Sequence, residues 1–63
     1  MMICKSVQQE ITEAASNAFA FCADWRDDDY VGFICDREGL DIDSPEVNNI
    51  VFQAQSDFNL GIL

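Results

Sequence analysis

Apolar residues recur at spacings of three and four over the first part of the chain. The repeating side chains within residues 5–25 are those of Val7, Ile11, Ala14, Ala15, Ala18, Cys22 and Trp25. This spacing places them on one face of a helix, while Gln and Glu side chains fall mostly on the other. The pattern predicts a first helix over 5–25, with Ser6 as a candidate N-cap and an end near the acidic run that begins at Asp24.

A second group of signals predicts another helix over residues 45–59. Ser44 can cap its N-terminus, Pro45 is preorganised for the first helical position, and Glu46 meets the positive end of the helix dipole. The helical spacing is then continued by Val47, Ile50, Val51, Ala54 and Phe58. The helix is expected to end at Asn59 or just beyond it, ahead of an apolar C-terminal tail.

Between the two predicted helices the pattern becomes typical of strands. Residues 30–35 are aromatic and β-branched, and residues 40–43 alternate strictly between apolar and acidic side chains. Asp36 and Gly39 stand at the first and fourth positions of a type I turn between them. These features predict a β-hairpin over 30–43.

The same middle segment also fits a short helix, because Val31, Ile34 and Cys35 have helical spacing. We adopt the hairpin, which gives one α+β domain over residues 1–63 in the order helix, strand, strand, helix. A lone hairpin is marginally stable in water, so it must pack on the helices. The Phe residues and the apolar tail exceed what these elements cover, which leaves association into a homodimer as an open alternative.

Charge is distributed unevenly along the chain. Twelve acidic residues face only Lys5, Arg26 and Arg37, which gives a formal net charge of −9. Residues 24–46 hold nine of the acidic residues and both arginines. Nucleic acids and anionic membranes repel such a surface, so neither is an expected ligand. The expected partner is a basic protein.

The acidic middle segment is the predicted partner-binding site. On the predicted second strand, Asp41 and Asp43 project from one face about 6.8 Å apart, two residues of about 3.4 Å each. Such a row of carboxylates can replace phosphates in a basic groove; the plainer alternative is a solvated acidic surface. Tyr30, Phe33 and Trp25 offer aromatic anchors beside the charge. The predicted contact residues are Asp27, Asp28, Asp29, Tyr30, Asp36, Glu38, Asp41 and Asp43.

Catalytic and metal-binding patterns are weak, and neither an enzyme nor a cofactor is expected. The chain has no His to activate a Ser or Cys nucleophile, and its three glycines are scattered. Cys4, Cys22 and Cys35 lack C-x-x-C spacing and fit small core residues of a reduced protein. A calcium loop from Asp27 to Glu38 is a further alternative, although its fifth position has no side-chain ligand.

In size, acidity and lack of catalytic motifs, the chain resembles the small phage-encoded inhibitors of bacterial defence, including DNA-mimicking anti-CRISPR and anti-restriction proteins. These share no motif, so the resemblance concerns overall character only. It implies an inhibitor that occupies the nucleic-acid-binding or PAM-reading surface of a basic defence protein, for example a CRISPR effector subunit. The alternative is an immunity protein or antitoxin that neutralises a basic nuclease. Without a signal peptide or an apolar run of about 18 residues, a soluble cytoplasmic protein is expected.

Overall fold

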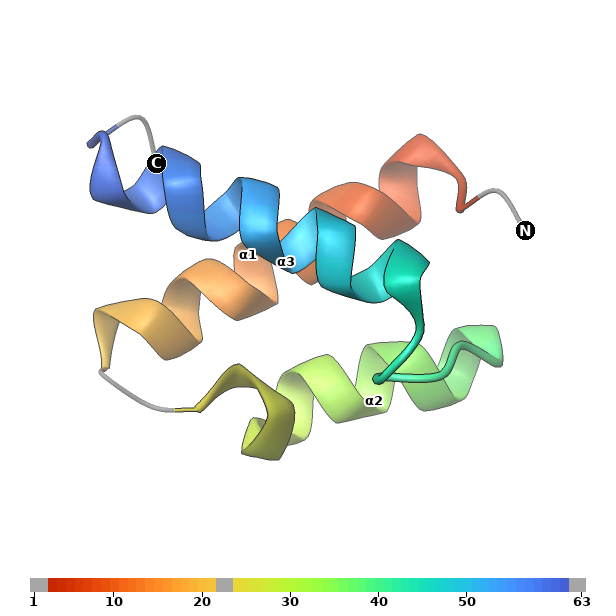
Figure 1. Cartoon of the computed structure of the whole chain (residues 1–63). Coiled ribbons are helices and arrows are strands. Elements are labelled where there is room, and N and C mark those ends of the chain that lie inside the picture. The colour runs from red at the N-terminus through yellow and green to blue at the C-terminus, as the bar shows by residue number, and fades with distance from the viewer. Residues whose placement is uncertain (1–2, 22–23, 62–63) are drawn as a thin grey trace.

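The computed structural model describes residues 3–21 and 24–61, and the secondary structure within these ranges is entirely helical (Figure 1). In chain order, its elements are α1 (Lys5–Ala20), the 3₁₀ helix η1 (Trp25–Asp27), α2 (Asp29–Glu38) and α3 (Pro45–Asn59). Since these ranges contain no strand, the predicted α+β fold with a hairpin over 30–43 is wrong.

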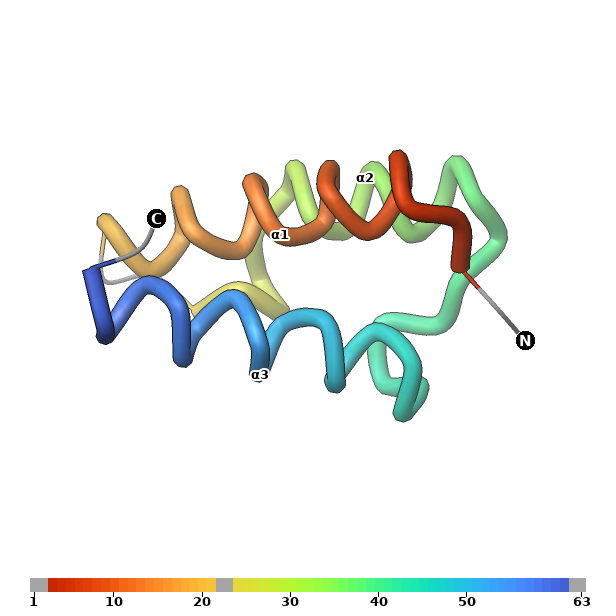
Figure 2. The backbone as a smooth tube through the Cα atoms, turned by 90° about the horizontal axis from the view of Figure 1, so that it is seen from above, coloured from red at the N-terminus to blue at the C-terminus, as the bar shows by residue number. Residues whose placement is uncertain are grey.

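α1 is the central element of the bundle. It packs against α3 and against α2, and η1 contacts both α1 and α2. α1 and α3 run in the same direction. α2, which comes between them in the chain, runs in the opposite direction (Figures 1 and 2). Among the described helices none is long and apolar enough to cross a membrane, since even α1 has 16 residues against the roughly 20 that a span needs.

α1 buries most of the apolar stripe that its spacing predicts. The buried side chains are Val7, Ile11, Ala14, Ala15 and Ala18. The helix begins at Lys5 as predicted, but its N-cap residue is Cys4 instead of Ser6, and no side chain caps it. The predicted end at residue 25 is wrong, because α1 stops at Ala20.

The acidic segment after α1 starts new helical turns instead of extending the first helix. Asp24 accepts a hydrogen bond from the backbone N–H of Arg26 at 3.0 Å and so caps η1. Acidic groups are favourable at a helix start and unfavourable at a helix end, where the dipole is negative. Trp25 therefore belongs to η1, where it is half-buried against the core. Cys22 lies outside the described residues.

α2 takes the place of the first strand of the predicted hairpin. The side chain of Asp28 caps this helix by accepting hydrogen bonds from the N–H groups of Tyr30 at 2.9 Å and Val31 at 3.1 Å. Val31, Ile34 and Cys35 are buried on one face, as the competing helical interpretation requires. Strand propensity depends strongly on context, and burial of this face against the rest of the bundle outweighs it.

Gly39 ends α2. Its φ of 68° lies in the left-handed region, which glycine adopts without strain. The Gly39 N–H donates to the carbonyl of Asp36 at 3.2 Å, and the Leu40 N–H donates to that of Cys35 at 2.7 Å, which together form a Schellman motif. Asp36 and Gly39 therefore belong to a helix C-terminus and not to the turn of a hairpin.

Residues 40–43 form the connection to α3. Leu40 and Ile42 are half-buried against the core, while Asp41 and Asp43 are exposed. The apolar and acidic side chains of this stretch thus lie on different sides, as the alternation predicts, although the backbone is not a strand. The Asp41 side chain instead accepts a hydrogen bond from the Asp43 N–H at 2.9 Å, which stabilises a local turn.

α3 spans Pro45–Asn59, the range predicted from the sequence. The Ser44 side chain accepts a hydrogen bond from the Val47 N–H at 3.3 Å, and Pro45 occupies the first turn. Val47, Val51 and Ala54 are buried, whereas Ile50 is half-buried against the same core. Phe58 is half-buried and contacts Phe19 of α1, with ring centroids 6.0 Å apart.

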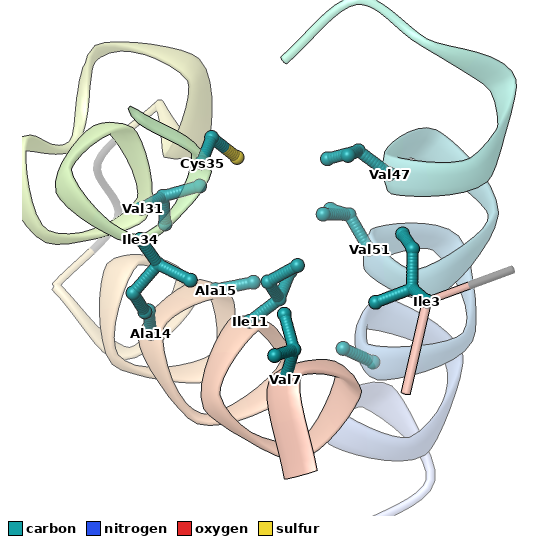
Figure 3. Close-up of a cluster of buried hydrophobic side chains, with 11 residues drawn as sticks. Ile3, Val7, Ile11, Ala14, Ala15, Val31, Ile34, Cys35, Val47 and Val51 are labelled. Atoms are coloured by element: carbon teal, nitrogen blue, oxygen red, sulfur yellow. The ribbon is translucent and has the colours of Figure 1, made fainter. Parts of the chain in front are cut away.

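The core lies where the three helices meet (Figure 3). Ile11 of α1 points into it and is completely buried, as are Val31 of α2 and Val47 of α3. Among the described residues, every buried core side chain is apolar. Burial raises the pKa of the Cys35 thiol, with smaller contributions from the charges of Asp36 and Asp41. Among the described residues, the polar and charged side chains therefore all lie at least partly at the surface.

The cap of α2 gives a stability prediction. We expect Asp28→Ala to lower the free energy of unfolding by about 1 kcal/mol, because two helical N–H groups lose their acceptor. Asp28→Asn should change it by only a few tenths of a kcal/mol, since Asn caps nearly as well. Urea unfolding followed by circular dichroism measures both. If the two variants lose the same unfolding free energy, Asp28 stabilises α2 through its charge and not through its capping hydrogen bonds.

Candidate functional site

An open hollow of about 650 Å³ lies where η1, α2 and the connection before α3 meet. We call it the acidic hollow. Its carboxylates are those of Asp27, Asp28, Asp29, Asp36 and Asp41. Its other lining residues are Arg26, Gly32, Phe33, Cys35, Leu40 and Ile42. The surface thus combines several negative charges with apolar side chains in one concave area.

The folding of the middle segment brings these carboxylates together. Asp27 ends η1 and Asp29 begins α2, so both lie beside the capping residue Asp28. Asp29, Phe33 and Asp36 follow one another at spacings of four and three, which places them on one side of α2. The connection then places Asp41 at the same hollow.

Asp36 differs from its neighbours because its charge opposes the stability of α2. It is exposed and lies in the last turn of the helix, where the dipole is negative. Asp28 and Asp41, in contrast, accept backbone hydrogen bonds, and Asp29 lies in the favourable first turn. Local folding accounts for these three carboxylates but not for that of Asp36.

Three residues of the predicted contact set do not line the acidic hollow. Tyr30 is 63% exposed on α2 but faces elsewhere, and Asp43 is exposed beyond the Asp41 turn. Glu38 accepts a hydrogen bond from Arg37 at 2.8 Å, and Arg37 also pairs with Glu10 of α1. Both carboxylates raise the pKa of Arg37, with Glu10 contributing most.

The predicted regular row of carboxylates at about 6.8 Å is also wrong, since it required a strand. Asp41 and Asp43 are instead joined within a turn. The negative charge is therefore gathered around a concave surface and is not displayed as a ladder.

Sequence reasoning overlooked Arg26, Leu40 and Ile42 as parts of the site. The Arg26 guanidinium lies 5.2 Å from the ring centroid of Trp25 and donates a hydrogen bond to the side-chain oxygen of Asn48 at 3.3 Å. It introduces a positive charge at the hollow. The alternation of residues 40–43 did contain a signal for Leu40 and Ile42, because it separates their side chains from those of Asp41 and Asp43.

A calcium loop does not fit the structure. From its third position, Asp29, to its last, Glu38, the proposed loop is a continuous helix, whereas a calcium loop must wrap its ligands around the ion. Across residues 3–21 and 24–61, no group of three or more acidic or Cys side chains is arranged to hold a metal.

The two described cysteines are free thiols that lie in different environments. Cys4 is exposed, and its hydrogen bond with the Ser6 hydroxyl at 3.4 Å is the main cause that lowers the pKa of its thiol. Cys35 is buried beneath the acidic hollow.

Comparison with protein-family models, curated proteins and solved structures found no match.

Proposed function

We propose that this chain is an acidic protein inhibitor that binds a basic nucleic-acid-binding surface of a bacterial defence protein and so excludes DNA or RNA. The observation that carries the proposal is the convergence of five carboxylates and the exposed ring of Phe33 around the acidic hollow. A concave area lined mainly by charges of one sign focuses the electrostatic field and accelerates the association of an oppositely charged partner. Phe33, which is 62% exposed, adds apolar contact area.

The position of Asp36 supports a binding role over a merely solvated acidic surface. A carboxylate in the last turn of a helix costs about 0.3–1 kcal/mol of stability. Lys or Arg would suit this position better, as Arg37 does beside it. Contact with a basic partner would explain why an acidic residue occupies this unfavourable position at the hollow.

An immunity protein or antitoxin for a basic nuclease uses the same chemistry and is the second candidate. The exposed aromatic rings of Tyr30 and Phe33 near the acidic residues support this role equally well. The two candidates differ in the partner: an immunity protein abolishes the activity of one toxic nuclease, whereas a defence inhibitor prevents target recognition.

The proposal is tested by capture from a bacterial lysate with two baits, the wild-type chain and the variant Asp36→Asn/Asp41→Asn. Asn preserves the Asp41 turn and removes one charge at each position. We expect the wild type alone to retain a basic nucleic-acid-binding protein, and added DNA to release it. Retention by both baits, or retention that DNA does not affect, would contradict the proposal.

Salt dependence provides a second prediction for the captured complex. We expect the association rate to fall by about tenfold or more as ionic strength rises, because screening removes the long-range attraction. Surface plasmon resonance at several salt concentrations measures this. A rate that does not change with salt would point instead to an apolar interface, formed by exposed residues such as Phe52 and Leu60.

A further inference from the structure

The acidic hollow differs in shape from a surface that imitates nucleic acid. Phosphates lie on the outside of a duplex, where a basic cleft can surround them. Here Phe33, Leu40 and Ile42 belong to the lining of a hollow, together with the carboxylates. A partner that is itself a cleft would contact the exposed carboxylates and Phe33 but would leave the half-buried Leu40 and Ile42 uncovered. A partner that protrudes can reach the apolar lining and the carboxylates together.

We infer that the part of the partner that enters the acidic hollow is a protruding segment bearing arginine, an inference that rests on the proposed function. Charge complementarity requires a basic side chain, because five carboxylates line the hollow against Arg26 alone. The apolar lining accommodates the stem of that side chain, since long basic residues bury their methylene groups and keep the charged end near polar groups. Both parts of the surface are then used at once.

Arginine is favoured over lysine by two features of the hollow. A guanidinium can stack on the exposed ring of Phe33, which a compact ammonium does less well. Its planar fork can also donate hydrogen bonds to Asp29 and Asp36, which lie on the same side of α2 as that ring. The chain already contains an arrangement of this kind, because the guanidinium of Arg26, which lines the hollow, lies over the ring of Trp25.

The inference is tested by titrating the isotope-labelled chain with an Arg-Gly repeat peptide and with a Lys-Gly repeat peptide of equal length. We expect the affinity for the arginine peptide to exceed that for the lysine peptide by about 3-fold or more. A difference of this size is within the range that a desolvated cation-π contact supplies. NMR shift changes should concentrate in residues 26–42. Phe33→Ala should remove the preference for arginine and Phe33→Tyr should keep it. Phe52→Ala is the control, because Phe52 is a similarly exposed ring on α3, outside the hollow.

Each outcome separates this inference from the proposed function. Equal affinity for the two peptides, or a preference that survives Phe33→Ala, would overturn the arginine assignment while leaving a charge-driven inhibitor intact. If neither peptide binds while the lysate partner is still captured through the hollow, the inference that a protruding segment enters the hollow is overturned. If the Asp36→Asn/Asp41→Asn bait captures the partner as well as the wild type does, the proposed function itself fails.

Discussion

Ile11→Ala is expected to lower the free energy of unfolding by about 2–5 kcal/mol. Ile11 is completely buried, and its side chain lies at the junction of the three helices (Figure 3). Its truncation removes apolar contacts and leaves a cavity that the surrounding helices fill only in part. A domain of this size has a total stability of about 3–9 kcal/mol, so the variant should be largely unfolded or melt at a much lower temperature.

Thermal unfolding followed by circular dichroism checks this expectation. Ile11→Val, which should cost about 0.5–1.5 kcal/mol, provides a measurable variant if Ile11→Ala does not fold. Phe52→Ala is the matched surface control and should change stability by no more than about 0.5 kcal/mol, since Phe52 is 64% exposed. A large loss at Phe52 that depends on protein concentration would instead indicate that a second copy covers α3.

Asp36→Lys combined with Asp41→Lys is expected to abolish most partner binding. Truncation of an acid that is desolvated against an arginine costs about 2–5 kcal/mol, or about 30-fold in affinity at the lower limit. Reversal adds repulsion to the lost attraction, so the double variant should exceed this loss. Asp28 is left unchanged, because a lysine there would also remove the cap of α2. Asp41→Lys removes the acceptor of the Asp43 N–H as well, so the single variant Asp36→Lys, which leaves that turn intact, is measured beside the double variant.

The control for charge reversal is Glu13→Lys combined with Gln9→Lys on α1. Both residues are exposed and lie outside the acidic hollow. Isothermal titration with the captured partner compares the two double variants, after circular dichroism has shown that each is folded. If the α1 variant loses binding and the Asp36/Asp41 variant retains it, the interface lies on α1 and the acidic segment is only a solvated surface.

The sequence predicted the helices where periodicity and capping agreed. α3 has its predicted limits because Ser44, Pro45 and the apolar stripe all indicate the same start and face. α1 has its predicted start and buried face, but its end was set too late because Trp25 continues the spacing by chance. Periodicity alone does not locate a helix end when the next element places its own apolar residue in register.

The middle segment was misinterpreted because local propensity and tertiary packing disagree there. Its β-branched and aromatic residues favour a strand, and Asp36 with Gly39 fits a turn. The same segment also forms a helix that has Asp28 as its N-cap, a Schellman motif at Gly39 and a buried apolar face. The decisive contribution is the burial of Val31 and Ile34 in the bundle, which no local pattern contains.

Part of the candidate site could be predicted, because the charged residues are visible in the sequence. The shape of the site is not. Five of the eight predicted contact residues line the hollow, since they are concentrated in one short stretch. The concavity, and the presence of Arg26 and Ile42 in it, depend on how η1, α2 and the connection fold together. A strand would have displayed the same charges outward.

Hydrogen exchange of the chain, alone and in complex with its captured partner, shows directly which surface the partner covers. We predict that binding slows exchange mainly in residues 26–42, around the acidic hollow, and leaves the exposed face of α3 around Phe52 unchanged. Slower exchange confined to α3 or to the outer face of α1, with no change in residues 26–42, would contradict it.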